Sequence, residues 1–171
     1  GDSVAKIKLE AIEELADHLS ADQIIAGMQT LLTQYRRALN ADRRHLIAQF
    51  TLTGVARKVV GVGSVGTRAW ILLLEADGGQ EPLFLQAKEA QESVLERFVG
   101  KSKYPNHGQR VVAGQRLMQA ASDIFLGWQR VPGLDGQVRD FYLRQLRDWK
   151  GSADIDTMTP NLMTAYSRVC G

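Results

Sequence analysis

The sequence contains very little cysteine, and its one residue of this type is Cys170, next to the C-terminal glycine. A single cysteine cannot form an internal disulfide or assemble a thiolate metal site, and this scarcity favours a reducing cytoplasm. The longest unbroken apolar run, Ala69 to Leu74, is far shorter than the roughly 20 residues of a membrane span. The sequence also lacks the apolar stretch of a signal peptide. We therefore expect a cytoplasmic protein with no membrane partner.

An excess of either charge sign is also missing, because 21 Lys and Arg residues are balanced by 19 Asp and Glu residues. A formal net charge of +2 gives no electrostatic footprint for a nucleic acid. The three histidines, His18, His45 and His107, lack the spacing of metal ligands, so no metal site is predicted. Hydrophobic residues at 44% and charged residues at 23% are typical of a globular domain. The sequence therefore predicts a folded domain without a nucleic-acid partner.

Helical patterns fill the first part of the chain. Ser20 and Gln23 have the spacing of a capping box, which marks the start of a helix. A stripe of apolar residues follows on one face of this helix, from Ile24 to Leu39. Helices are expected at residues 4–19, 20–39 and 42–48, so that residues 1–50 form an N-terminal helical segment.

From residue 55 onward the sequence is rich in strand-forming residues and in turns. Strands are expected at residues 55–60, 67–75, 82–88, 124–130 and 138–146. Helical periodicity is expected at residues 90–98, 109–122 and 159–168. The predicted fold class is α+β, with a kinase-like sheet of about five antiparallel strands, one main helix packed on it and helices before it. Residues 51–150 would form this lobe, and residues 151–171 a C-terminal helical segment.

A glycine-rich motif lies between the first two predicted strands. Gly61, Gly63 and Gly66 match the pattern G-x-G-x-x-G, with Ser64 and Val65 between them. A dinucleotide-binding fold needs a helix to begin at such glycines, but the residues that follow favour a strand. Strand, glycine-rich turn and strand is the arrangement in which a flap lays backbone N–H groups over nucleotide phosphates. A structural hairpin without a ligand is the alternative interpretation.

Lys88, at the end of the third predicted strand, is the second candidate residue. Alternation along a strand places it on the opposite face from Leu83, Leu85 and Ala87. An ammonium group beside the flap could bind two phosphate groups through charge-assisted hydrogen bonds. A lysine at a strand end is more often only solvated, but the order of flap, strand pair, lysine, helix and two strands favours phosphate binding.

Several separate blocks of the sequence resemble a bacterial family catalogued as domain of unknown function 2252. The resemblance covers about residues 30–171 and is carried by residues 58–68, 83–90, 108–112, 114–128 and 144–148. That family is longer than this chain and resembles the kinase-like, aminoglycoside-phosphotransferase-like superfamily. The resemblance implies a nucleotide-binding lobe whose catalytic loop and metal-binding aspartate lie outside this chain.

The resemblance also implies the ligand and the reaction. The nucleotide would be ATP or similar, with Mg²⁺ bound only when the remaining part is present. The backbone of Leu146, Arg147 and Asp148 lies where kinase-like folds have their hinge and could meet an adenine edge. The full-length protein would be a small-molecule phosphotransferase or a kinase-like regulator, while this chain alone is expected to be inactive and prone to self-association through exposed apolar surface. The alternative is a non-catalytic scaffold or interaction module that kept the lobe.

One feature departs from the kinase-like pattern. Such sites hold the strand lysine with a glutamate from the following helix, but residues 109–122 contain no glutamate. The sequence leaves open a neutral partner or a charged partner on the preceding segment. These candidates are Gln115 and Gln119, and Glu89, Glu92 and Glu96. A neutral partner would position Lys88 less firmly, which favours the non-catalytic alternative.

Overall fold

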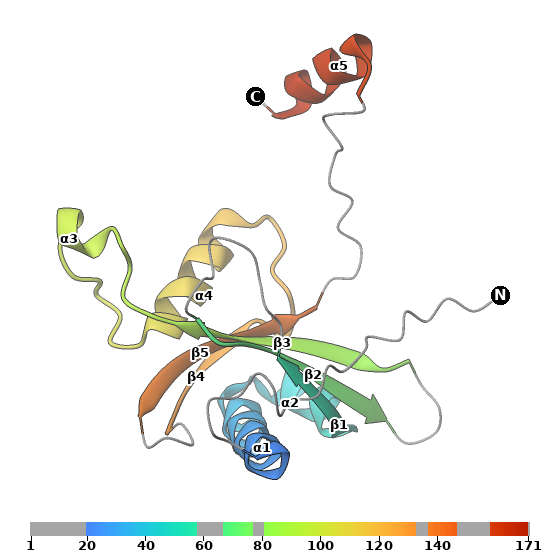
Figure 1. Ribbon diagram of the computed structural model, residues 1–171, viewed down its shortest axis with the longest axis vertical. Helices are drawn as coiled ribbons and strands as arrows, with labels where there is room; N and C mark the ends of the chain where they lie inside the picture. Colours follow the sequence, from blue (N-terminus) through green and yellow to red (C-terminus); the bar gives the residue numbers. More distant parts are fainter. Residues whose placement is uncertain (1–19, 58–66, 77–80, 133–136, 147–157, 171) are drawn as a thin grey trace.

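The computed structural model describes residues 20–57, 67–76, 81–132, 137–146 and 158–170. These residues form an α+β fold in which helices lie on both faces of a five-stranded sheet (Figure 1). The strands are β1 (Phe50–Arg57), β2 (Ala69–Ala76), β3 (Leu83–Ala90), β4 (Gly127–Pro132) and β5 (Val138–Gln145). The predicted α+β class with an antiparallel sheet of five strands is confirmed.

The strand order in the sheet is β1-β2-β3-β5-β4, and every neighbouring pair is antiparallel. The first three strands form a meander, in which Leu72 of β2 lies between Val55 of β1 and Leu85 of β3. The last strand in the chain, β5, pairs with β3, which leaves β4 at the edge. Strand β3 is therefore the middle strand, with its two neighbours on either side.

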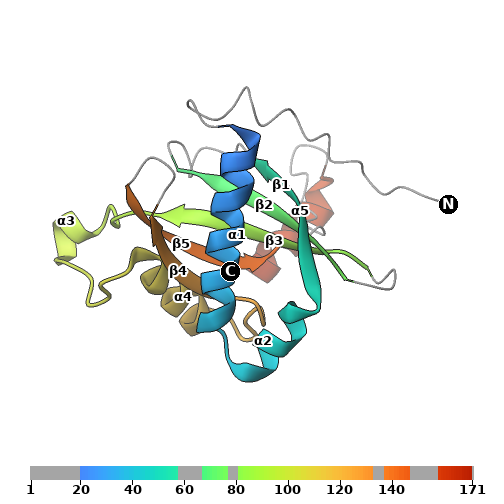
Figure 2. The same cartoon turned by 90° about the horizontal axis from the view of Figure 1, so that it is seen from below.

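Helix α1 (Ala21–Ala38) covers one face of the sheet, and the short α2 (Ala41–Ala48) follows it (Figure 2). The predicted capping box is confirmed, because the Ser20 hydroxyl accepts a hydrogen bond from the Gln23 backbone N–H at 3.3 Å. The Gln23 side chain in turn accepts one from the Ser20 N–H at 2.9 Å. The backbone N–H groups of Ser20 and Gln23 thus both have a local acceptor, which fixes the start of α1.

The main hydrophobic core lies between α1 and the sheet. Leu31 and Tyr35 of α1 are fully buried there, together with Leu85 of β3 and Leu143 of β5. A glycine on β4 allows this approach, because a β-carbon at Gly127 would lie 2.7 Å from the Tyr35 ring. The apolar stripe predicted on the helix is therefore the face that packs on the sheet, although Ile25 is exposed.

Helix α4 (His107–Met118) lies on the opposite face of the sheet, where it contacts β3, β4 and β5 (Figure 1). Its N-cap is Asn106, whose side-chain oxygen accepts a hydrogen bond from the Gln109 N–H at 2.9 Å. Val112 is completely buried against the strands. The sheet is thus a middle layer between α1 and α4.

Four predicted elements differ from the structure, and one of them is the helix expected at residues 109–122, which runs from His107 to Met118. The helix expected at residues 90–98 is wrong, since Ala90 still belongs to β3 and only the single turn α3 (Glu96–Val99) is helical. Strand β1 begins at Phe50 instead of residue 55, and β4 begins at Gly127 instead of residue 124. Helix α5 (Pro160–Cys170) agrees with the expected helix at residues 159–168. The helix expected at residues 4–19 lies outside the described residues.

Candidate functional site

Lys88 lies on the middle strand of the sheet. Its backbone partners are Ala69 at the start of β2 and Tyr142 on β5. The preceding residue, Ala87, is buried in the core beneath α1, so alternation places Lys88 on the face that carries α4. The predicted division of β3 into an apolar face and a face bearing Lys88 is confirmed, and the lysine is half-buried.

The glycine-rich segment lies between β1 and β2 in the sequence, and β2 starts beside this lysine. Strand β1 ends at Arg57, which pairs with Trp70, and β2 starts at Ala69, the partner of Lys88. The predicted flap residues lie outside the described residues; they are Gly61, Gly63, Ser64, Val65 and Gly66. Because β1 and β2 are antiparallel neighbours, the parallel strand-helix-strand unit of a dinucleotide-binding fold is excluded here.

Polar side chains surround Lys88 on the same face of the sheet. Gln86, two residues earlier, is only 3% exposed and pairs across the sheet with Arg144. The Nε atom of Arg144 is buried and has no hydrogen-bond partner within the described part of the chain. Burial raises the pKa of the Tyr142 hydroxyl, and the charge of Arg144 opposes that rise. Cross-strand neighbours therefore bring two cations, Lys88 and Arg144, onto one face.

The predicted hinge begins where β5 ends. The Leu146 N–H donates a hydrogen bond to the Phe84 carbonyl at 2.9 Å, so the chain leaves the sheet beside β3. The other two predicted hinge residues, Arg147 and Asp148, lie outside the described residues. The structure thus places Leu146 on the same pair of strands as Lys88, but at the opposite end of β3.

Two of the carboxylates considered as partners of Lys88 are engaged by arginines. Glu89 follows Lys88 in β3 and therefore points to the other face. Its carboxylate lies 3.4 Å from Arg68 and 3.7 Å from Arg139. Glu96 lies 3.8 Å from Arg110. Glu92 is exposed, and so is Gln119, the C-cap residue that follows α4.

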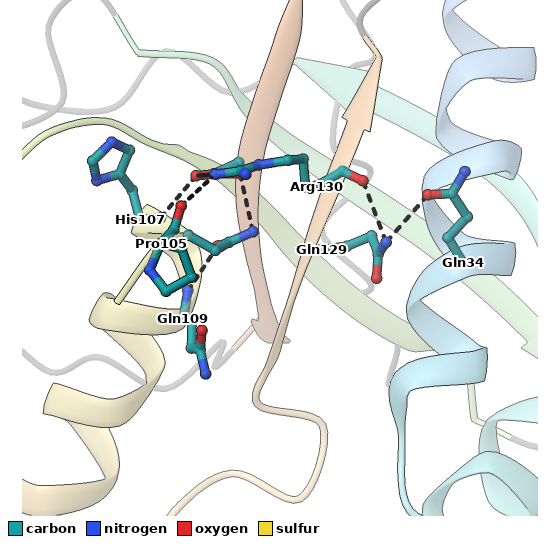
Figure 3. A network of polar contacts seen from close by, with 8 residues as sticks. Gln34, Pro105, His107, Gln109, Gln129 and Arg130 are labelled. Atoms are coloured by element: carbon teal, nitrogen blue, oxygen red, sulfur yellow. Dashed lines mark hydrogen bonds and ion pairs between the residues drawn. The ribbon is translucent and has the colours of Figure 1, made fainter. Parts of the chain in front are cut away.

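A buried carboxylate that sequence reasoning missed lies at the N-terminus of α4. Asp140 is 6% exposed and accepts hydrogen bonds from Arg130 at 2.6 and 2.8 Å. It also accepts them from the Asn106 side chain at 3.0 Å and from the His107 backbone N–H at 2.7 Å. Figure 3 shows how Arg130 and the residues that begin α4 converge at this point. The network fixes the first turn of α4 to β4 and β5.

The pKa of Asp140 reflects these contacts. Burial by itself would raise the pKa, but hydrogen bonds from Arg130 and the His107 backbone, with the charge of Arg130, hold it below its ordinary value. The alternation of Asp140, Tyr142 and Arg144 along the predicted strand at residues 138–146 is the sequence signal that could have revealed this polar stripe.

Within the described ranges, no group of three or more His, Cys, Asp or Glu side chains could hold a metal ion. In the same part of the chain, no helix combines the length and the apolar character needed to cross a membrane.

Comparison with known families identifies the chain. The sequence profile of a family described as uncharacterized proteins conserved in bacteria, DUF2252, matches residues 6–171. The chain belongs to this family. No curated protein and no solved structure matches it. The DUF2252 resemblance is thus confirmed, and its match extends further toward the N-terminus than the sequence blocks that first indicated it.

Proposed function

We propose that this DUF2252 chain binds the phosphate groups of ATP or a similar nucleotide on the sheet face that bears Lys88. One observation carries the proposal: Lys88 pairs directly with Ala69, the first residue of the strand that follows the glycine-rich segment. A flap formed by Gly61, Gly63, Ser64, Val65 and Gly66 would then return to the sheet next to the strand position of Lys88.

The charges around Lys88 suit an anionic ligand. Lys88 and Arg144 are diagonal neighbours on adjacent strands, so their side chains can reach a common ligand. The next carboxylate along β5 on this face, Asp140, is already engaged by Arg130. Charge-assisted hydrogen bonds from two such cations would hold phosphate oxygens firmly.

The order of elements also supports a kinase-like phosphate site. In protein kinases, a glycine-rich loop covers the phosphates, the phosphate-binding lysine is on the third strand, and a helix follows that strand. Here the glycine-rich segment joins β1 and β2, Lys88 is on β3, and α4 packs on the same face. The backbone of Leu146, Arg147 and Asp148 would meet the adenine edge.

Phosphoryl transfer to a small molecule is the reaction that we propose for such a site in the full-length protein. Mg²⁺ would accompany the nucleotide and neutralise charge on its phosphates. The residues of this chain would bind and orient the nucleotide, and Lys88 and the flap would hold its phosphates.

Isothermal titration calorimetry with ATP tests the proposal. Lys88→Met keeps the length of the side chain but removes its charge, and should weaken binding about 10- to 100-fold. Lys101→Met removes the same charge from an exposed loop position and serves as the matched control. Equal ATP affinity of the wild type and Lys88→Met, or no ATP binding by the wild type, would overturn the proposal.

A non-catalytic scaffold is the second candidate, and the composition of α4 favours it. Helix α4 contains no Asp or Glu, so the helix packed beside Lys88 supplies no carboxylate to hold the lysine. A scaffold that no longer binds a nucleotide would show no heat of ATP binding in the same titration. A scaffold that retains the nucleotide would bind ATP through Lys88 without consuming it.

A further inference from the structure

A separate polar pocket lies beside the edge strand β4. The end of α1, the start of α2, the end of α4 and the start of β4 meet there. Its volume is about 350 Å³, which is within the range of small-ligand sites. The residues that give it polar and aromatic walls are Tyr35, Asn40, Arg43, Arg116, Ser122 and Trp128. Four of these lining side chains, Asn40, Arg43, Arg116 and Trp128, carry N–H donors, which makes the pocket unlike an ordinary apolar cleft.

Two arginines from different helices, Arg43 of α2 and Arg116 of α4, line this pocket, and each carries a guanidinium group. Arg116 donates one hydrogen bond to the Leu126 carbonyl at 2.8 Å and lies 5.9 Å from the centre of the Trp128 ring. Arg43 lines the pocket but forms no hydrogen bond or ion pair with any other described residue. A guanidinium has five N–H donors, so most donors of both groups are left for a ligand.

The charges of both arginines affect the pKa of the Tyr35 hydroxyl. Burial raises the pKa of the Tyr35 hydroxyl, the charge of Asp123 adds to that rise, and the charges of Arg43 and Arg116 both oppose it. The Tyr35 hydroxyl itself donates a hydrogen bond to the Phe125 carbonyl. Tyr35, Arg43 and Arg116 all line this one pocket.

Two further polar side chains of the pocket, Asn40 and Ser122, are exposed to solvent. Asn40 precedes α2, and its side chain makes no capping hydrogen bond. The Ser122 hydroxyl has no hydrogen bond to another residue in the described ranges. The carboxylate that opposes the arginines, Asp123, already accepts the N–H groups of Phe125 and Gln145. Donors and positive charge are therefore in excess.

We propose that this pocket binds the phosphate group of a small phosphorylated molecule between Arg43 and Arg116. A phosphate monoester has up to two negative charges and three terminal oxygens, which match two guanidinium groups and additional amide and hydroxyl donors. A carboxylate has one charge and two oxygens, and would leave donors unused. In the sheet, Trp128 is separated from Lys88 by Tyr142, so this site lies two strands away from the nucleotide site proposed above.

Nuclear magnetic resonance titration of the ¹⁵N-labelled chain with inorganic phosphate, at constant ionic strength, tests this site. The indole N–H signal of Trp128 should move on titration, whereas that of the core residue Trp70 should not. Arg43→Ala should raise the dissociation constant about tenfold. Arg37→Ala is the matched control, because it removes the same charge from an exposed position on α1 outside the pocket. Lys88→Met should leave phosphate binding here unchanged, which separates this proposal from the nucleotide site.

Three results would overturn the phosphate pocket. The first is a Trp128 signal that stays in place at saturating phosphate, or that moves equally in the wild type and Arg43→Ala. The second is an equal loss in Arg43→Ala and Arg37→Ala, which would show only a general effect of net charge. The third is acetate binding as tightly as phosphate, which would assign the pocket to carboxylates instead.

Discussion

At the scale of single residues, Asp140 of β5 joins its own strand to two other elements, β4 and α4. Its carboxylate accepts hydrogen bonds from Arg130 of β4 and from the Asn106 side chain and His107 N–H at the start of α4. The negative charge also lies at the positive end of the helix dipole. One side chain of β5 thus holds α4 on the sheet.

Replacing this carboxylate tests its contribution to stability. Asp140→Asn keeps the shape but removes the charge, and should lower the free energy of unfolding by about 1–3 kcal/mol. The loss should stay below that of a fully buried ion pair, because the Arg130 side chain is 48% exposed and therefore screened by solvent. Urea unfolding near neutral pH measures the change, with the exposed Asp42→Asn as a control. Equal stability of the wild type and Asp140→Asn would contradict this role.

The pKa of Asp140 also predicts a dependence on pH. Because its pKa is lower in the folded state than the ordinary value of 3.8, the stabilisation is complete above that value. It is lost as the pH falls through the folded-state pKa. The difference in unfolding free energy between the wild type and Asp140→Asn should therefore shrink as the pH falls below 3.8. A difference that stays constant or grows in acid would show that the charge of Asp140 is not responsible.

Among the candidate residues, alternation along a strand was enough to predict the face of Lys88. It could place Asp140 on a polar stripe but could not reveal its hydrogen bonds, because the donors come from β4 and from the start of α4, far away in the sequence. Contacts between distant segments depend on strand order, and no local pattern contains that information. The same reason explains why the sequence could not show that Arg43 and Arg116, which lie in separate helices, line one pocket.

At the scale of elements, helix α4 approaches the sheet so closely that one position must be glycine. A β-carbon at Gly108 would lie 2.4 Å from the carbonyl oxygen of Phe141, which is a backbone atom of β5 and cannot rotate away. In contrast, a β-carbon at Gly114 in the same helix would meet nothing within 4 Å. The helix is thus in tight contact at its start and open to solvent further along.

This contrast supplies a matched pair of variants. Gly108→Ala should destabilise the protein by about 1–3 kcal/mol, because α4 must move away from β5. Gly114→Ala should leave the stability unchanged or raise it by up to about 1 kcal/mol, because alanine is the better helix former. Chemical denaturation midpoints of both variants check this. Similar midpoints for the two variants would mean that α4 is not seated on β5 as described.

The sequence predicted the regular elements better than their ends. Strands and long helices have strong periodic patterns, and the capping box at Ser20 located the start of α1 correctly. The helix expected at residues 90–98 failed because Ala90 pairs with Asp140 in the sheet, and because Leu95 and Phe98 find no surface to pack on. The early start of β1 at Phe50 was missed, since its pairing with Ala76 is a contact between strands.

At the scale of the whole molecule, the two faces of the sheet have different roles. One face is apolar and forms the core with α1. The other carries Lys88, Tyr142 and Arg144 beside α4. Because every second residue of β3 contributes to the core, the residues between them are held rigidly without being part of it. A binding site on such a face is positioned by the core of the protein, as functional sites require. Self-association of the chain stays a prediction.

Lysine acylation, measured by mass spectrometry with and without ATP, tests most directly whether Lys88 contacts the nucleotide phosphates. An amine bound to phosphate is shielded from an acylating reagent, so saturating ATP should slow the modification of Lys88 several-fold. The exposed Lys101 and Lys103 serve as internal controls in the same sample and should react at unchanged rates. The central claim would be contradicted if Lys88 were acylated at the same rate in the presence and absence of ATP.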